Sequence, residues 1–222
     1  MNAIERLKIV FEDESIIVAD KPEGLLTIAT ASERSKTAYA MLRQYLNSKR
    51  PPEQLFIVHR LDREASGLLV FAKSVEAKER LQDQFKDHSA GRRYIAVVEG
   101  RVKADDSTIR SYLAENAAYR VYSTKNSRVG KLAVTHVHVL KRSSKHTLVE
   151  VRLETGRKHQ IRVHLAEKGH PIVGDKNYGS RANPIQRLAL HGAHLDFRHP
   201  DTGKLLQFNS QPPKLFQSLL TL

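Results

Sequence analysis

Short apolar segments separated by polar turns run along most of the chain, and this pattern predicts a protein rich in β-strands. The predicted strands cover residues 7–11, 15–20, 55–58, 68–72, 92–102, 131–141, 146–154, 187–197 and 205–209. The arms 131–141 and 146–154 alternate apolar and polar residues on either side of a short basic turn, which is typical of a hairpin. Residues 104–130 have no clear period, and we assign them only strands and loops.

Helical spacing of apolar residues predicts helices at 36–48, 74–87, 159–168 and 214–222. Ser74 is the expected N-cap of the second helix, and Gly169 ends the third. We expect one face of the second helix to comprise Val75, Lys78, Leu81, Gln82 and Phe85. Strands and helices in this mixture, without repeat or linker, indicate one α+β catalytic domain over residues 1–222.

The charge balance gives information about the binding partner rather than about the fold. Lys and Arg number 37 and Asp and Glu 24, so the net charge is +13, which favours a polyanionic partner such as RNA. No apolar run approaches the ~20 residues of a membrane span, and residues 1–6 do not resemble the start of a signal peptide. Zero cysteines exclude thiol nucleophiles and disulfides and are compatible with a reducing cytoplasm.

Residues 59–67 place five ionisable side chains between two strongly apolar segments. Asp62 is at their centre. An aspartate there has two interpretations: a turn residue that bonds its own backbone, or a nucleophile in a cleft. His59, Arg60 and Arg63 would keep the carboxylate ionised and would attract a phosphate backbone, which favours the second interpretation.

Four blocks in a fixed order resemble the RluA-type pseudouridine synthases, which are RNA-modifying isomerases. Residues 59–62 (His-Arg-Leu-Asp) with 66–73 resemble the family signature, and residues 20–25 resemble its N-terminal motif. Residues 93–100 resemble its tyrosine motif, and 156–165 with the segments that follow resemble its third block. The resemblance extends from about residue 10 to the C-terminus, and four blocks together are highly specific.

The resemblance implies the pseudouridine synthase fold: a mixed, mainly antiparallel sheet with flanking helices and a central RNA-binding cleft. It implies isomerisation of uridines in ribosomal RNA, transfer RNA or both, by a cytoplasmic monomer that needs no cofactor and no metal. Many relatives carry an additional S4-type RNA-binding domain, and we expect a short member without one. Ala65 stands where members often have threonine.

The resemblance also implies site residues, each with a plainer alternative. Asp62 is the catalytic carboxylate. Arg162 pairs with Asp62, the alternative being a surface arginine in water. Tyr94 faces the target base, the alternative being core packing. Arg60 fills the gap that a flipped nucleotide leaves, the alternatives being a phosphate contact or an ion pair with Glu64.

Two rival functions remain open. The first is an RNA-binding module without catalysis, for which Asp62 would have little use. The second is a metal-dependent nuclease, which needs clustered ligands. His136-x-His138 and His191-x-x-His194 resemble metal ligands, but the carboxylates do not follow a recognised zinc spacing. We interpret these histidines as core or surface residues, Asp175 and Asp196 as turn formers, and His59 as a residue that holds its loop through a ring hydrogen bond.

Overall fold

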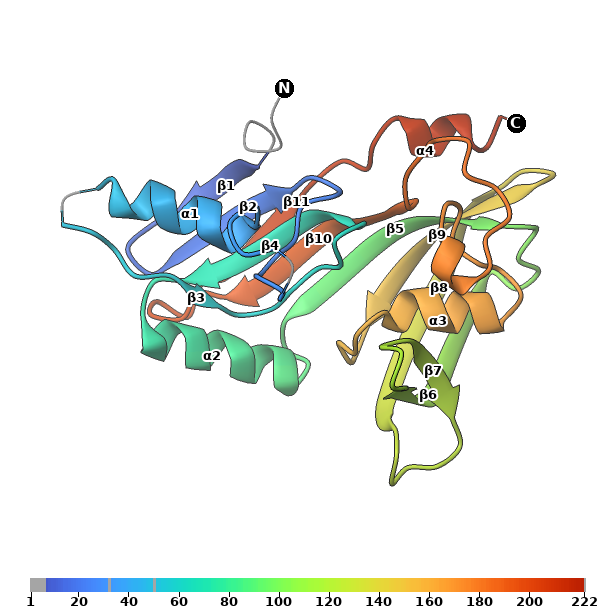
Figure 1. Cartoon of the computed structure of the whole chain (residues 1–222), viewed down its shortest axis with the longest axis horizontal. Helices are drawn as coiled ribbons and strands as arrows, with labels where there is room; N and C mark the ends of the chain where they lie inside the picture. Colours follow the sequence, from blue (N-terminus) through green and yellow to red (C-terminus); the bar gives the residue numbers. More distant parts are fainter. Residues whose placement is uncertain (1–6, 32, 50, 222) are drawn as a thin grey trace. The chain divides into compact units, whose positions relative to one another are not determined.

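A computed structural model describes residues 7–31, 33–49 and 51–221, whose elements are labelled in Figure 1. The chain divides into two compact units. Unit 1 comprises Met1–Gly91 and Gly192–Ser210, and unit 2 comprises Arg92–His191 and Gln211–Leu222. That the two units make up one catalytic domain stays a prediction.

Unit 1 is a sheet with two helices. Its elements are β1 (Lys8–Glu12), β2 (Ile16–Lys21), α1 (Ala38–Asn47), β3 (Phe56–Ile57), β4 (Ser66–Ala72), α2 (Val75–Lys86), most of β10 (Leu190–Arg198) and β11 (Leu205–Asn209). The strand order is β1-β2-β4-β10, with β3 beside β4 and β11 beside β10. The pairs β1/β2, β2/β4, β3/β4 and β10/β11 are antiparallel.

Strand β4 is the centre of the unit 1 core, since all seven of its residues are buried. Its Val70 packs in a cluster with Ile16 and Phe197. Gly67 has φ +121°, and a Cβ there would lie 2.3 Å from the carbonyl oxygen of Gly192. Only glycine permits this approach of β4 to β10, because every other side chain would clash with that backbone.

Both predicted helices of unit 1 are present and begin at side-chain caps. Ser74 caps α2 by accepting from the Ala77 N–H at 3.0 Å, as predicted. The face that we predicted for α2 contains the buried Leu81, but Val75 on that face is 42% exposed, and Ala77, which the prediction did not include, is buried. The small Ala77 side chain fits close against the sheet, so the apolar face is rotated away from Val75.

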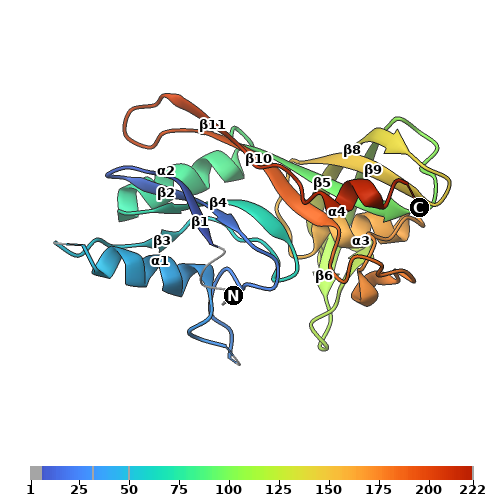
Figure 2. The same ribbon diagram turned by 90° about the horizontal axis from the view of Figure 1, so that it is seen from above.

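Unit 2 has five antiparallel strands, a helix of eight residues and a second, short helix. Its elements are β5 (Gly91–Glu99), β6 (Asp106–Glu115), β7 (Val121–Thr124), β8 (Lys131–Arg142), β9 (His146–Leu153), α3 (Gln160–Glu167), the 3-10 turn η2 (Lys176–Tyr178) and α4 (Leu215–Ser218). The order β5-β9-β8-β6-β7 is antiparallel throughout. Helix α3 packs against β7 and β8, and Figure 1 shows it beside β8. Figure 2 shows the same ribbon from above.

The predicted hairpin is confirmed as β8 and β9, and β11 has the predicted bounds. Segment 104–130, which had no clear period, contains β6 and β7. The last helix is shorter than predicted, ending at Ser218, and Leu222 lies outside the described residues. Within the described part of the chain, no helix is long and apolar enough to cross a membrane.

Candidate active site

Lys21 holds the loop that carries Asp62. The Lys21 side chain is fully buried at the end of β2. Its Nζ donates to the carbonyl oxygens of Ala65 at 2.6 Å, Leu25 at 2.7 Å, Pro22 at 2.9 Å and Arg63 at 3.3 Å. A buried ammonium needs such acceptors to offset its lost hydration. One cation therefore fixes carbonyl groups in residues 22–25 and in residues 63–65.

The same segment contacts the loop at two more points. Thr27 Oγ1 donates to the Leu61 carbonyl at 2.8 Å and accepts from the Leu61 N–H at 3.1 Å. The Gly24 N–H donates to the Arg63 carbonyl at 2.8 Å, and Arg63 Nε donates to the Gly24 carbonyl at 3.1 Å. We call residues 21–27 the clamp, because they bond the backbone immediately before and after Asp62.

Asp62 is half-buried, between the buried Leu61 and an exposed turn. Its carbonyl accepts from the Ala65 N–H at 3.2 Å, so its backbone opens the turn. This backbone bond is compatible with both interpretations of Asp62. The side chain stands in a loop whose backbone is fixed on either side, which is the preorganisation that a catalytic carboxylate requires.

His59 has the structural role that we predicted. Its Nε2 accepts from the Val70 N–H of β4 at 3.2 Å, which confirms the ring hydrogen bond. Its ring also packs against Phe85 of α2, with the ring centroids 4.8 Å apart. Arg60, the next residue, is exposed, so a long cation stands at the surface of the Asp62 loop.

Arg162 is a buried residue of α3 rather than a surface arginine. Its Nε donates to Asp175 Oδ2 at 2.7 Å and its Nη2 donates to Asp175 Oδ1 at 2.9 Å. The side chains are 3% and 0% exposed. Our assignment of Asp175 as a turn former was therefore incomplete, since its carboxylate is the counter-ion of Arg162. A guanidinium has five N–H donors and this pair uses two, so pairing of Arg162 with Asp62 stays a prediction.

The start of α3 is fixed by Gln160, the first helical residue. Its Oε1 accepts from Thr155 Oγ1 at 2.8 Å and from the Arg157 N–H at 3.0 Å. Its Nε2 donates to the Val134 carbonyl at 3.0 Å and to Thr135 Oγ1 at 2.9 Å. All four bonds join neutral groups, and they fix the rotation of α3 and hence the direction of Arg162, two residues on.

His164 continues this neutral network through the core of unit 2. It is fully buried, with Nδ1 2.8 Å from Thr135 Oγ1 and Nε2 3.0 Å from Ser111 Oγ. Burial lowers the pKa of His164 from 6.5 to about 4, so the ring is neutral at pH 7. The sequence did not identify this residue, because a histidine on an amphipathic helix has no distinguishing pattern.

Tyr94 lies on β5, 7% exposed, opposite Val151 of β9. Val151 is in turn opposite Val137 of β8, and cross-strand partners share a face of the sheet. Thr135, two residues from Val137, bonds α3. Tyr94 therefore lies on the face that α3 covers, and its contact with a target base stays a prediction.

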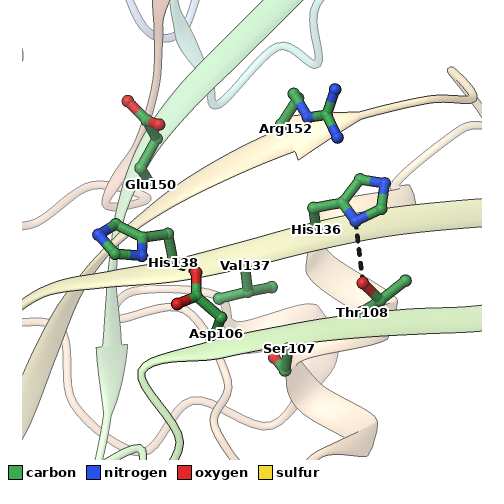
Figure 3. A pocket seen from close by; sticks show the side chains of 8 residues that line it. All are labelled: Asp106, Ser107, Thr108, His136, Val137, His138, Glu150 and Arg152. Carbon is green, nitrogen blue, oxygen red and sulfur yellow. Dashed lines mark hydrogen bonds and ion pairs between the residues drawn. The ribbon is translucent and has the colours of Figure 1, made fainter.

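The paired histidines of β8 lie on the opposite face, around a pocket of about 490 Å³ shown in Figure 3. His138 Nδ1 is 2.7 Å from Asp106 Oδ1. His136 Nδ1 is 2.9 Å from Thr108 Oγ1, and its Nε2 is 2.5 Å from Glu154 Oε1. Among the described residues, no three His, Asp or Glu side chains are arranged to hold a metal ion.

His194 resembles the β8 histidines in having a carboxylate partner. Its Nε2 is 2.9 Å from Asp196 Oδ2, and its Nδ1 is 2.7 Å from Asn209 Oδ1. Asp196 lies inside β10, so its assignment as a turn former was wrong. Alternation in a strand places residues 194 and 196 on the same face, and this spacing is what pairs them.

The family model described as RNA pseudouridylate synthase matches residues 15–167. Ribosomal large subunit pseudouridine synthase D of Zymomonas mobilis is 36% identical over 96% of this chain and 71% of the relative. The uncharacterized RNA pseudouridine synthase YlyB of Bacillus subtilis is 38% identical over 96% of this chain and 72% of the relative.

The fold agrees with these sequence matches. Human RNA pseudouridylate synthase domain containing 4 superposes with a TM-score of 0.80 at 23% identity, over 99% of this chain and 93% of that one. The chain therefore has the pseudouridine synthase fold, with the mainly antiparallel pairing that we predicted. It belongs to the RNA pseudouridylate synthase family, and its reaction class is that of an isomerase acting on RNA.

Proposed function

We propose that the protein converts uridines of large-subunit ribosomal RNA to pseudouridine, with Asp62 as the catalytic carboxylate. The choice of RNA is supported by the names of its relatives, among them ribosomal large subunit pseudouridine synthase D of Zymomonas mobilis and of Pseudomonas aeruginosa. Transfer RNA is the alternative substrate. For both substrates we assign the protein to the cytoplasm.

The observation that carries the proposal is the clamped loop. The reaction breaks the bond between C1′ and N1 of uridine, turns the base within the site and joins C1′ to C5. No electrons or outside atoms are exchanged, so a carboxylate that attacks or stabilises the substrate is the main chemical requirement. Asp62 is a half-buried carboxylate whose flanking residues Leu61 and Arg63 are bonded by the clamp.

Three further residues complete the proposed site. Arg162 pairs with Asp62 and fixes its rotamer, because a guanidinium already held by Asp175 is a rigid donor. Tyr94 stacks on or hydrogen-bonds the uracil. The uridine must leave its stack to reach a half-buried carboxylate, and the exposed Arg60 fills the gap.

Tritium release tests the proposal directly. Large-subunit ribosomal RNA carrying tritium at uracil C5 is incubated with the protein in the presence of a chelator, and label is released when C1′ joins C5. We expect release by the wild type. Asp62→Asn keeps the size of the side chain but loses the charge, and the rate should fall by at least about a thousandfold.

Asp106→Asn is the matched control, since it removes an exposed carboxylate that is far from the clamp in sequence and belongs to the pocket of Figure 3. Its rate should equal that of the wild type. Equal release by Asp62→Asn would refute the assignment of Asp62. Binding of RNA without any release, tested also on transfer RNA, would favour the non-catalytic binding module.

A further inference from the structure

A second pocket lies at the other end of the sheet face shown in Figure 3. It has a volume of about 600 Å³, and we call it the hairpin hollow. Its lining includes Arg110 and Tyr112 of β6, Thr124 and Lys125 at the end of β7, and Leu132 of β8. None of these residues is part of the proposed catalytic site.

The register places the hollow on the face of unit 2 that α3 leaves uncovered. Tyr112 is opposite Thr124 on one side and opposite Leu132 on the other, so these three share a face. Ser111, the neighbour of Tyr112, points the other way and bonds His164 of α3. The floor of the hollow is therefore one aromatic ring with an aliphatic side chain beside it, open to solvent.

The two pockets on this face differ in charge. In the pocket of Figure 3, each histidine has a carboxylate partner, and Glu150 is 3.9 Å from Arg93. In the hairpin hollow, Arg110 and Lys125 are exposed, and among the described residues no carboxylate lies within ion-pair distance of either. The lining of the first pocket contains two carboxylates, Asp106 and Glu150, whereas the lining of the hollow contains two cations and no carboxylate, so the hollow is the more positive of the two.

The turn that follows β7 is ordered by its own hydrogen bonds. The Asn126 carbonyl accepts from the Gly130 N–H at 3.0 Å, and its Oδ1 accepts from the Arg128 N–H at 2.9 Å. A Cβ on Gly130 would lie 2.8 Å from the Cβ of Tyr112, so the turn backbone packs against the tyrosine. Arg110 projects from strand β6 and Lys125 directly precedes this ordered turn, so both cations start from a fixed backbone, which lowers the entropy lost on binding.

We propose that the hairpin hollow binds one unpaired nucleotide of the RNA substrate, outside the catalytic site. The base stacks on Tyr112, and the phosphates contact Arg110 and Lys125. An aromatic floor beside unpaired cations is the arrangement that binds single-stranded nucleic acid. The inference rests on the proposed function for the identity of the RNA, and it adds a second surface that recognises an unpaired segment of that RNA.

The test measures affinity for ribosomal RNA across a range of salt concentrations, so it does not depend on catalysis. Arg110→Gln with Lys125→Gln should weaken binding about tenfold at low salt and lower the salt slope by about 1.5, since two phosphate contacts are lost. Tyr112→Leu keeps the apolar floor but loses the stacking ring, and we expect about tenfold weaker binding with an unchanged salt slope.

Lys141→Gln with Lys145→Gln is the matched control, because it removes two exposed cations at the opposite end of the β8 hairpin. Its affinity should stay within about twofold of the wild type. If the hollow variants bind no worse than this control, the inference is overturned, whatever the tritium assay reports. If the hollow variants bind RNA more weakly than the control while the wild type releases no tritium, binding at the hollow is supported and the proposed isomerase activity is refuted.

Discussion

The Asp62 loop and helix α3 are held in place by different sets of interactions. The loop in unit 1 depends on a single buried cation, Lys21, that gathers four carbonyl oxygens. Helix α3 in unit 2 is oriented by the neutral side chains of Gln160 and His164 together with the buried ion pair of Arg162 and Asp175. One charge organises a loop of irregular backbone efficiently, whereas a neutral network needs several members and a fixed protonation state.

The two units accordingly differ in their response to acid. In unit 1, burial alone would raise the pKa of Glu12, but hydrogen bonds from Lys49 and Lys73 outweigh it and lower the pKa from 4.5 to about 2. In unit 2, His164 has a pKa lowered to about 4, below that of an unfolded histidine. As pH falls from 7, unit 2 is expected to lose stability first. The stabilisation that Glu12 gains from Lys49 and Lys73 is expected to fall only below about pH 4.5.

The largest expected effect on stability comes from the ion pair of α3. Asp175→Asn keeps the shape of the side chain but leaves the buried Arg162 without a charged counter-ion, which should cost about 3–5 kcal/mol. Urea unfolding at pH 7.5 measures it. Asp106→Asn, at an exposed carboxylate, should change stability by less than about 0.5 kcal/mol. Equal stabilities for the two variants would mean that the neutral network alone holds α3.

A somewhat smaller loss is expected from the clamp. Lys21→Met fills the same space but leaves the carbonyls of Leu25 and Ala65 buried without their donor, at a cost of about 2–4 kcal/mol. Because the loop backbone loosens, kcat for tritium release should fall more than RNA affinity. Lys145→Met, at an exposed lysine, is the control. A normal kcat in Lys21→Met would show that the loop holds Asp62 without the clamp.

The smallest effect is the pH dependence of His164. Its folded pKa is below its unfolded pKa, so the unfolded state binds more protons between about pH 4 and 6.5, and stability falls as pH falls through this window. The loss from pH 7.5 to 5.0 should be about 2 kcal/mol. His164→Gln should lower stability at pH 7.5 but remove that part of the slope. An unchanged slope would assign the acid sensitivity to another group.

Strands with apolar residues on one or both faces could be predicted from the sequence, and β11 is the clearest case. Strands β6 and β7 could not, because the uncovered face of unit 2 carries residues such as Asp106 and Thr108, and Ile109 and Leu113 alone give too short an alternation. The pattern reports burial, so a strand with one solvated, charged face gives a weak prediction.

The position of Asp62 could also be predicted, since it lies between β3 and β4 as expected. The groups that hold its loop could not. Lysine is rarely buried, so nothing in the segment around Lys21 indicates a cation enclosed by carbonyls. Asp175 is 13 residues from Arg162 and outside its helix, and only the folded chain shows that the two meet. Partners of this kind depend on tertiary packing, which local spacing does not encode.

Unit 1 is discontinuous in the chain, and this fixes the order in which it can be completed during synthesis. Strand β4 neighbours β10, but about a hundred residues that belong to unit 2 are translated between them. Until Gly192 leaves the ribosome, the edge of β4 opposite β2 has only the two-residue strand β3 beside it, although all seven residues of β4 are buried in the finished protein. The nascent chain must protect this apolar edge in the interval, by chaperones or by provisional contacts.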